Sequence, residues 1–393
     1  MIVLIAHRLY TPREEIVDPL IFIEDGFISS VSSRVDRQLP SNATVVDLRS
    51  NHPEAILAPG FIDIHIHGGA GVDVMLASPI ELDRLGLFLA TRGVTAYLPT
   101  TVAAPIDETC ASLERIANAI EAARNSSESN SDTVQAHPIG IHLEGPFLSH
   151  KRRGVHPPEN LLAPTFEVFN RFWQAARGHI RMMTIAPELP GAIELIAEAS
   201  RRKVCVSLGH SDADTATARQ AIHSGARHAT HTFNAMRPLD HRDPGILGEA
   251  LTNDQLTADI IADGIHVAPE IVKLFLSAKG KDRAVLITDA TAATGMPDGT
   301  YQLGPIVVEV KDGKCTLDGR LAGSVLTMDR AVRNVMHFAN WGLRDAVRAV
   351  TLNPARATGL AHHGEITPGA EANLVLLNAD GQVLKTMFRG PGF

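Results

Sequence analysis

Phe-Ile-Asp-Ile-His-Ile-His-Gly-Gly, residues 61–69, is the stretch from which the fold can be inferred. Side chains two residues apart share a face of a β-strand, so His65 and His67 point one way while Ile64 and Ile66 point the other. Two imidazoles on one strand face, directly before a Gly-Gly break, suit a divalent metal held at the carboxyl end of a strand. The alternative is a solvated strand end, so the interpretation depends on the rest of the chain.

The 61–69 segment opens a middle region in which strands and helices alternate. Apolar runs typical of strands cover 61–67, 94–98, 138–144, 181–186, 204–208, 227–231, 257–261 and 284–289. Helical patterns lie between them, for example at 78–91, 108–123, 191–201 and 213–224. This α/β alternation predicts a (β/α)8 TIM-like barrel, whose chemistry lies at the carboxyl ends of the strands. A doubly wound open sheet is the rival, but no Gly-x-Gly-x-x-Gly turn follows the first middle strand.

Both ends of the chain are β-rich. Short strand patterns occupy 2–5, 20–23, 27–31, 44–48, 372–378 and 382–388, and Asp25-Gly26 is a plausible hairpin turn. We therefore expect residues 1–57 and 361–393 to form a small β-sandwich domain, and residues 58–360 to form the barrel. The polar run at 126–132 predicts a solvated loop.

Composition limits the class of protein. The 393 residues, 45% of them hydrophobic, can bury a large core. A net charge of −8 argues against a nucleic-acid binder or a protein that binds anionic membranes. The three cysteines, Cys110, Cys205 and Cys315, are far apart, which favours a reducing compartment over a disulfide framework. No stretch approaches a membrane-spanning length and no cleavage-like segment follows the N-terminus, so we expect a soluble cytoplasmic protein.

Further residues of metal-binding type stand where later strands end. Glu144 ends the third strand, His210 follows the fifth, His231 ends the sixth and Asp289 ends the eighth. A catalytic metal site needs neutral imidazoles and carboxylates from different elements, with an open position for water. Any one of these residues could simply end a strand through a hydrogen bond. Several of them at corresponding positions favour a metal site on the active face of the barrel.

With these segments assembled, the chain resembles the N-acetylglucosamine-6-phosphate deacetylases of the amidohydrolase superfamily. The resemblance covers nearly the full length and rests on Ala-Pro-Gly-Phe-Ile-Asp-Ile-His-Ile-His-Gly (58–68), His-Leu-Glu-Gly-Pro-Phe (142–147), Gly-His-Ser (209–211), His-Thr-Phe-Asn-Ala-Met (231–236), Ala-Asp-Gly-Ile-His (262–266), Thr-Asp-Ala (288–290), Leu-Ala-Gly-Ser-Val-Leu-Thr-Met-Asp (321–329) and Gly-Glu-Ile-Thr-Pro-Gly-Ala-Glu-Ala-Asn (364–373). The first and last are general to amidohydrolases. The Glu-Gly-Pro, Phe-Asn-Ala-Met and Ala-Gly-Ser-x-Leu-Thr-Met segments are more specific to the deacetylase branch.

The resemblance implies a divalent metal ion, Zn²⁺ or Fe²⁺, with one or two ions per subunit. Glu144, His210 and His231 would hold the principal metal, and Asp289 would be the general base and acid. Members of the family differ at the first-strand histidine pair. This chain keeps both histidines, so a second site, bridged by Glu144, is open to it.

The resemblance also implies a small-molecule amino-sugar phosphate as substrate. Arg242 and His266 would bind its phosphate and, in the family, reach into the neighbouring subunit's site, which implies a homodimer. His156 would lie over the acetyl group or the sugar ring. Arg242 could instead be an ordinary surface cation, since Asp240 and Asp243 surround it. The full set expected around the substrate is Val155, His156, Asn234, Ala235, Arg242, Asp263, His266, Leu321, Ala322 and Gly323.

The expected reaction is hydrolysis of the N-acetyl group of N-acetyl-D-glucosamine 6-phosphate to D-glucosamine 6-phosphate and acetate. A metal lowers the pKa of bound water towards ~7 and polarises the amide carbonyl. Asp289 would take the proton of that water and deliver it to the leaving amine. The alternatives are the galactosamine epimer as substrate, a cyclic amidase, or a non-catalytic assembly homologue. Cyclic amidases usually carry a bridging lysine on the fourth strand, and 181–188 has none; a non-catalytic homologue should have lost ligands.

Overall fold

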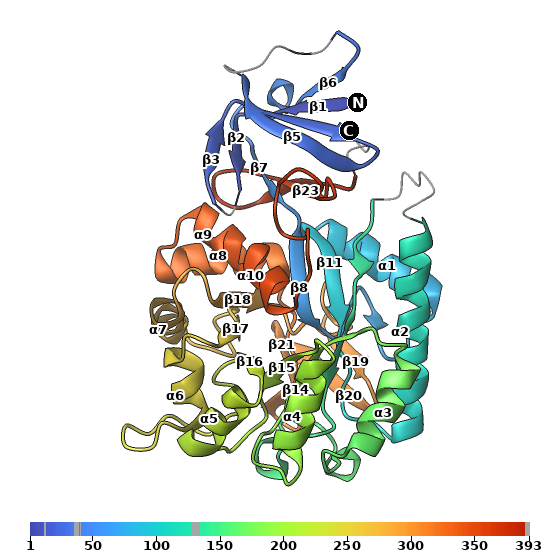
Figure 1. The fold of residues 1–393 in the computed structure, drawn as a ribbon, viewed down its shortest axis with the longest axis vertical. Helices are drawn as coiled ribbons and strands as arrows, with labels where there is room; N and C mark the ends of the chain where they lie inside the picture. Colours follow the sequence, from blue (N-terminus) through green and yellow to red (C-terminus); the bar gives the residue numbers. More distant parts are fainter. Residues whose placement is uncertain (12, 35–38, 40, 127–133, 390–393) are drawn as a thin grey trace.

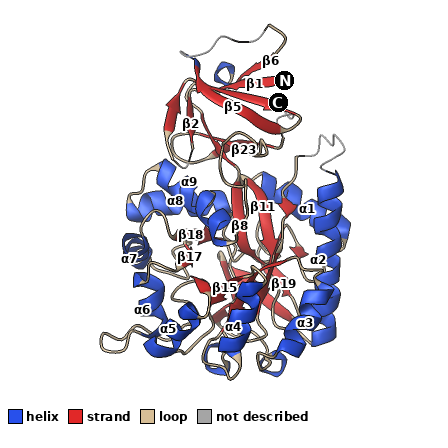
Figure 2. Cartoon of the chain, in the orientation of Figure 1, coloured by secondary structure: helices blue, strands red, loops and turns tan. Residues whose placement is uncertain are grey.

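The computed structural model describes residues 1–393 except 12, 35–38, 40, 127–133 and 390–393. The fold is a TIM-like barrel with a small β-sandwich built from both chain ends, as expected. Figure 1 shows the sandwich, which carries both termini, above the larger barrel, and Figure 2 shows strands inside the barrel and helices around it. Most of the run 126–132, predicted to be a solvated loop, lies outside the described residues.

Eight parallel strands form the barrel. They are β8 (Phe61–Ile66), β11 (Val94–Pro99), β13 (Ile141–Glu144), β14 (Ile180–Ile185), β15 (Cys205–Leu208), β16 (Ala226–Ala229), β17 (Thr257–Ile261) and β18 (Ala284–Ile287). One sheet has the order β12-β11-β8, with β12 at His137–Pro138, and a six-stranded sheet runs from β13 to β18. Isolated parallel bridges join the two sheets, Thr100 to His142 and Ile66 to Ala290. The predicted strands are therefore all present, with the third divided into β12 and β13.

Helices cover the outside of the barrel (Figure 2). They are α1 (Pro79–Ala90), α2 (Ile106–Ser126), α3 (Phe166–Ala175), α4 (Ala192–Arg201), α5 (Thr215–His223), α6 (Gly245–Thr252), α7 (Pro269–Lys279), α8 (Met328–Ala339), α9 (Leu343–Ala349) and α10 (Leu352–Ala357). Side-chain caps fix several helix starts. Ser78 and Glu81 form a reciprocal capping box at α1, and Asp214 accepts the Thr217 amide at α5. The helices predicted at α1, α2, α4 and α5 are confirmed.

The sandwich consists of two sheets with the orders β5-β4-β1-β6 and β24-β23-β7-β2-β3. Its strands are β1 (Ile2–Ile5), β2 (Arg8–Tyr10), β3 (Glu15–Val17), β4 (Pro19–Glu24), β5 (Phe27–Ser33), β6 (Thr44–Asp47), β7 (Ile56–Pro59), β23 (Leu374–Leu377) and β24 (Val383–Met387). Asp25 and Gly26 have φ of 51° and 82°, as a tight turn between β4 and β5 requires. Leu57 and Leu374 share one buried core, so the two chain ends depend on each other. The exact domain boundaries stay a prediction.

One element was not expected from the sequence. Between β18 and α8 the chain forms an antiparallel sheet of β19 (Gly299–Leu303), β20 (Ile306–Lys311), β21 (Lys314–Leu317) and β22 (Arg320–Leu321). We call it the inserted sheet. Its strands lie towards the end of the barrel away from the sandwich (Figure 1). Near it, β9 (Gly68–Gly69) and β10 (Val72–Asp73) form a short ribbon, and the Asp73 carboxylate accepts the Gly304 amide at 2.8 Å. This bond ties the inserted sheet to the barrel.

Candidate metal centre

Six buried side chains of metal-binding or acid–base type converge at the carboxyl ends of the barrel strands. They are His65, His67, Glu144, His210, His231 and Asp289. The last three lie two residues beyond β15, β16 and β18, with φ of 48°, 30° and 51°. The sixth and eighth strands thus end two residues earlier than predicted, because a left-handed residue cannot continue an extended strand.

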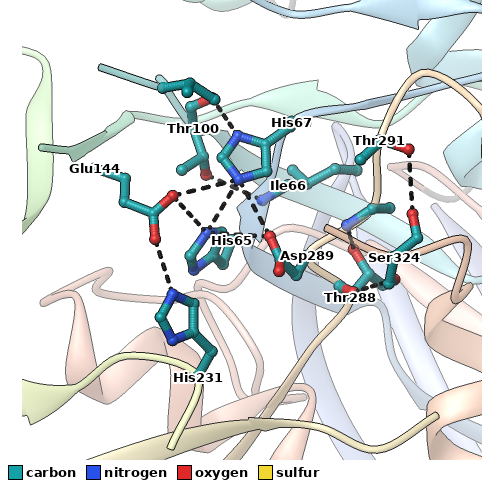
Figure 3. Close-up of polar contacts among 12 residues, drawn as sticks. His65, Ile66, His67, Thr100, Glu144, His231, Thr288, Asp289, Thr291 and Ser324 are labelled. Atoms are coloured by element: carbon teal, nitrogen blue, oxygen red, sulfur yellow. Dashed lines mark hydrogen bonds and ion pairs between the residues drawn. The ribbon is translucent and has the colours of Figure 1, made fainter. Parts of the chain in front are cut away.

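Glu144 lies between two groups of imidazoles (Figure 3). Its Oε1 is 3.0 Å from His231 Nε2 and 3.3 Å from His210 Nε2. Its Oε2 is 3.3 Å from His65 Nε2 and 3.4 Å from His67 Nε2. One carboxylate therefore faces two pairs of ring nitrogens, one pair with each oxygen, which is the layout of a bridging ligand.

Asp289 lies beside the first-strand pair (Figure 3). Its Oδ1 is 3.1 Å from His67 Nε2 and 3.4 Å from His65 Nε2. Burial alone would raise the pKa of Asp289, but the neighbouring His65 and His67 hold it below its ordinary value. The group is therefore a carboxylate at neutral pH, able to accept a proton.

Hydrogen bonds behind two of the rings decide which nitrogen faces the cluster. His67 Nδ1 donates to the Thr100 carbonyl at 3.0 Å, and His210 Nδ1 donates to the Arg152 carbonyl at 2.9 Å. Nε2 of each ring therefore faces Glu144, as an N–H when the ring is protonated and as a lone pair when it is neutral. Because a lone pair and a carboxylate repel each other, this arrangement requires a proton or a cation between them. The donor set, with its supporting carbonyls, fits a divalent metal.

His156 lies against the same cluster in a different chemical role. Its Nδ1 accepts the Ala103 amide at 3.1 Å, so a neutral ring carries its proton on Nε2, 3.7 Å from Glu144 Oε2. Burial, followed by the charge of His210, lowers the pKa of His156 to about 3. The ring is therefore neutral and faces the site with an N–H, which suits donation to a bound ligand better than metal ligation.

Beneath the cluster, the barrel interior is polar. His142 Nε2 lies 2.8 Å from Thr184 Oγ1, and His228 Nε2 donates to Asp259 Oδ2 at 2.9 Å. The other Asp259 oxygen accepts the backbone N–H of His231, which fixes that residue after its strand. Asp259 was not identified from the sequence. An aspartate inside the apolar strand 257–261 was the available signal.

Residues expected around the substrate lie in loops at this end of the barrel. Asn234 Nδ2 donates to the His231 carbonyl at 3.2 Å. A Cβ on Gly154 would lie 3.2 Å from His210 Cε1 and 4.0 Å from Ala235 Cβ. The loop carrying Val155 and the turn carrying Ala235 therefore meet beside His210.

Other expected contacts are more scattered. After β17, His266 Nδ1 lies 2.7 Å from Asp263 Oδ2. Arg242 is exposed, and its backbone N–H donates to Asp240 Oδ1 at 2.8 Å. Within the part of the chain that the structure describes, no hydrogen bond or ion pair links Arg242 to the cluster.

The segment 321–323 begins in β22, the last strand of the inserted sheet. Leu321 is 36% exposed, whereas Ala322 is buried. A Cβ on Gly323 would lie 3.0 Å from the Asp289 carbonyl oxygen, so this glycine packs directly against the Asp289 backbone. Among the described helices, none is long and apolar enough to cross a membrane.

A strand-end cluster of histidines and carboxylates in a TIM-like barrel is the site type of a metal-dependent hydrolase, and the chain belongs to the amidohydrolase family, which matches residues 56–391. More particularly, it is similar to the N-acetylglucosamine-6-phosphate deacetylase of Bacillus subtilis (strain 168), with 37% identity over 388 residues, 97% of this chain and 94% of that protein.

Two other proteins are similar over almost the whole chain. The N-acetylgalactosamine-6-phosphate deacetylase of Escherichia coli O157:H7 is 36% identical, covering 99% of this chain and 98% of that protein. A mutant N-acetyl-D-glucosamine-6-phosphate deacetylase from Mycobacterium smegmatis, solved with N-acetyl-D-glucosamine-6-phosphate, superposes with a TM-score of 0.87 at 34% identity, covering 99% of this chain and 98% of that chain. The resemblance inferred from the sequence motifs is confirmed.

Proposed function

We propose that this chain hydrolyses the N-acetyl group of N-acetyl-D-glucosamine 6-phosphate, giving D-glucosamine 6-phosphate and acetate. The observation that carries the proposal is Glu144 between two imidazole pairs, with the Asp289 carboxylate beside one of them. The relative from Bacillus subtilis and the complex from Mycobacterium smegmatis support the choice of substrate.

The proposed principal metal ligands are Glu144, His210 and His231. His65 and His67, with the second oxygen of Glu144, would hold a second ion, so one or two ions per subunit are open. Zn²⁺ and Fe²⁺ both suit imidazole and carboxylate ligands. When bound, the metal polarises the acetyl carbonyl and lowers the pKa of water.

Two side chains would move or donate protons in the reaction. Asp289 would accept a proton from the attacking water as the new C–O bond forms at the acetyl carbon. It would return that proton to the amine nitrogen as the C–N bond breaks, because an amide anion leaves poorly at neutral pH. The Nε2–H of His156 would donate to the carbonyl oxygen and stabilise the charge that develops there.

Sugar and phosphate contacts complete the proposal. Asn234 and Ala235 would contact the sugar or its phosphate, and Arg242 and His266 would bind the phosphate in the site of a partner subunit. The proposal thus includes a homodimer, placed in the cytoplasm. The galactosamine epimer is a second candidate substrate, since a relative 36% identical to this chain is named for it.

Acetate release from a panel of N-acetylated sugars tests the proposal. The panel contains N-acetylglucosamine 6-phosphate, its galactosamine epimer and unphosphorylated N-acetylglucosamine, each with metal-replete and chelator-treated protein. We expect fastest release from N-acetylglucosamine 6-phosphate, and loss of that activity on chelation. Faster turnover of the epimer would reassign the substrate, and no release from either phosphate would refute the proposal.

A further inference from the structure

Asp289 is held by a chain segment from beyond the inserted sheet. Ala290 and Ser324 form a parallel bridge, so segment 322–324 runs beside the end of β18. The Ser324 amide donates to the Asp289 carbonyl at 2.7 Å. The Ser324 hydroxyl donates to the Thr288 carbonyl at 2.6 Å (Figure 3). Two successive carbonyls, those of Asp289 and the residue before it, are therefore bound by one serine.

The remaining polar atoms of Ser324 are also engaged. Its carbonyl accepts the Thr291 amide at 3.0 Å, and its hydroxyl oxygen accepts the Leu326 amide at 2.9 Å. The residue is only 2% exposed. Ser324 thus binds the chain on both sides of Asp289 and is itself held in place.

Gly323 makes this close approach possible. Its φ is 61°, and a Cβ there would lie 2.5 Å from Thr291 Cγ2 and 3.0 Å from the Asp289 carbonyl oxygen. The first distance is shorter than a side-chain carbon tolerates, and the second is shorter than most such contacts. A glycine followed by serine is therefore the combination that lets this segment bind the Asp289 backbone.

Asp289 needs such support because its backbone is left-handed, with φ of 51°. This conformation costs free energy for a residue with a Cβ, less for aspartate than for most, and hydrogen bonds from neighbouring segments stabilise it. On one side, the Asp289 amide donates to the His65 carbonyl at 2.9 Å. On the other side, Ser324 binds its carbonyl.

We propose that Ser324 is a positioning residue, which holds the Asp289 backbone so that its carboxylate faces the substrate water and amine. The proposal rests on the proposed function for the role of Asp289. Ser324→Ala tests it because it removes the bond to Thr288 and weakens the support of Asp289. Thr358→Val is the matched control: Thr358 is 2% exposed, and its hydroxyl donates to the Pro354 carbonyl at 2.7 Å, just after α10.

Kinetics on N-acetylglucosamine 6-phosphate give the first readout. Misplacing a catalytic group by a fraction of an ångström lowers the rate of the chemical step more than binding, so kcat of Ser324→Ala should fall at least ~10-fold while KM changes less than about threefold. Ser324→Thr, which keeps the hydroxyl, should regain most of kcat. A fall in kcat of Ser324→Ala no larger than that of Thr358→Val overturns the proposal.

Amide hydrogen exchange provides a readout that does not depend on the reaction. Peptides covering 286–292 should exchange faster in Ser324→Ala than in the parent, while peptides from β13 and β15 should not change. Unchanged exchange at 286–292 would overturn the positioning role whatever the activity. If peptides covering 286–292 exchange faster in Ser324→Ala but the parent protein releases no acetate, the positioning role would be supported and the proposed function refuted.

Discussion

For three imidazoles of the cluster, the atom behind the ring determines how the ring faces Glu144. Carbonyl oxygens accept the Nδ1–H of His67 and His210, whereas the Ala103 amide donates to Nδ1 of His156. When they are neutral, the first two rings therefore face Glu144 with a lone pair, whereas the neutral third ring faces it with an N–H. Under the proposed function, these three histidines take two roles: His67 and His210 as metal ligands, and His156 as a hydrogen-bond donor.

Asp289→Asn should abolish deacetylation while metal and substrate still bind. The amide fills the same space but cannot carry the proton, and loss of a general acid–base typically costs ~10²–10⁴-fold in rate. Single-turnover acetate release and metal content of the purified variant check this. Near-normal turnover in a metal-replete variant would remove Asp289 from the mechanism.

His210→Ala should lose the principal metal and nearly all activity, because it leaves a gap in a small ligand set. His65→Ala should be milder if one ion suffices and equally severe if two are needed. Metal stoichiometry by elemental analysis, plotted against kcat, separates these cases. His223→Ala, an exposed site on α5, is the control, and full metal retention in His210→Ala would contradict the ligand assignment.

At the scale of elements, the ends of strands and helices determine where functional side chains lie. β15, β16 and β18 each end two residues before a left-handed residue, namely His210, His231 and Asp289, and these three side chains belong to the cluster. Helix starts are fixed by short-range side-chain contacts. The Glu81 carboxylate accepts the Ser78 amide at 2.8 Å, while Ser78 Oγ accepts the Glu81 amide.

Ser78→Ala should lower the free energy of unfolding by about 1 kcal/mol, because it removes the capping box of α1. Urea unfolding of the parent and the variant measures the difference. Ser277→Ala is the matched control, since this exposed serine of α7 donates only to the Lys273 carbonyl within its own helix. That change should be neutral or slightly stabilising. Equal effects of the two substitutions would argue against the cap.

Lys279, the last residue of α7, should make the free energy of unfolding depend on pH in the alkaline range. It is 1% exposed, and Nζ donates to the carbonyls of Asn253 at 3.1 Å and Leu256 at 2.6 Å. Burial lowers the pKa of Lys279 from 10.5 to about 8. The unfolded chain therefore binds more protons between those values, and the free energy of unfolding should rise with pH across that window.

Lys279→Met isolates this contribution because methionine does not titrate. The difference in unfolding free energy between parent and Lys279→Met should shift in favour of the parent as the pH rises from ~7.5 to ~9.5. Urea titrations at both pH values measure it. The same pH dependence in both proteins would show that Lys279 keeps its proton in the folded state.

At the scale of the whole molecule, periodicity was enough to predict the barrel and the sandwich. Apolar strands that alternate with amphipathic helices can pack into only a few folds, which is why the barrel was predicted. In the sandwich, the predicted Asp25-Gly26 turn lies between β4 and β5. The inserted sheet was not predicted because its short strands interrupt the alternation of strands and helices. Its β20, Ile306–Lys311, has an alternating burial pattern.

The members of the candidate cluster could be predicted from the sequence because they stand at the ends of apolar strands. Its supporting contacts were not predictable, because many are made by backbone atoms. The Thr100 and Arg152 carbonyls carry no side-chain signal, and the contacts of Ser324 depend on how a distant segment returns to β18. Sequence motifs identify candidate reactive groups, whereas the fold determines which backbone atoms hold them.

Assembly is the remaining property of the whole molecule. Arg242 lies on an exposed loop, and its phosphate contact in the site of a partner subunit is part of the proposal. Arg242→Ala should raise KM for the 6-phosphorylated sugar by about ten- to more than a hundredfold, since a charge-assisted contact is worth roughly 1.5–3 kcal/mol. Turnover of the unphosphorylated sugar should hardly change. Arg201→Ala, an exposed arginine on α4, is the control.

Mixing Arg242→Ala chains with Asp289→Asn chains tests whether the arginine acts between subunits. A heterodimer of these chains contains one site with both groups intact, provided that Arg242 serves the partner's site. Activity at low substrate concentration should then exceed that of either variant alone. Subunit exchange is verified by mass spectrometry of differently tagged chains. If exchange is complete and activity does not recover, Arg242 serves its own chain's site or none, and the shared-site homodimer is refuted.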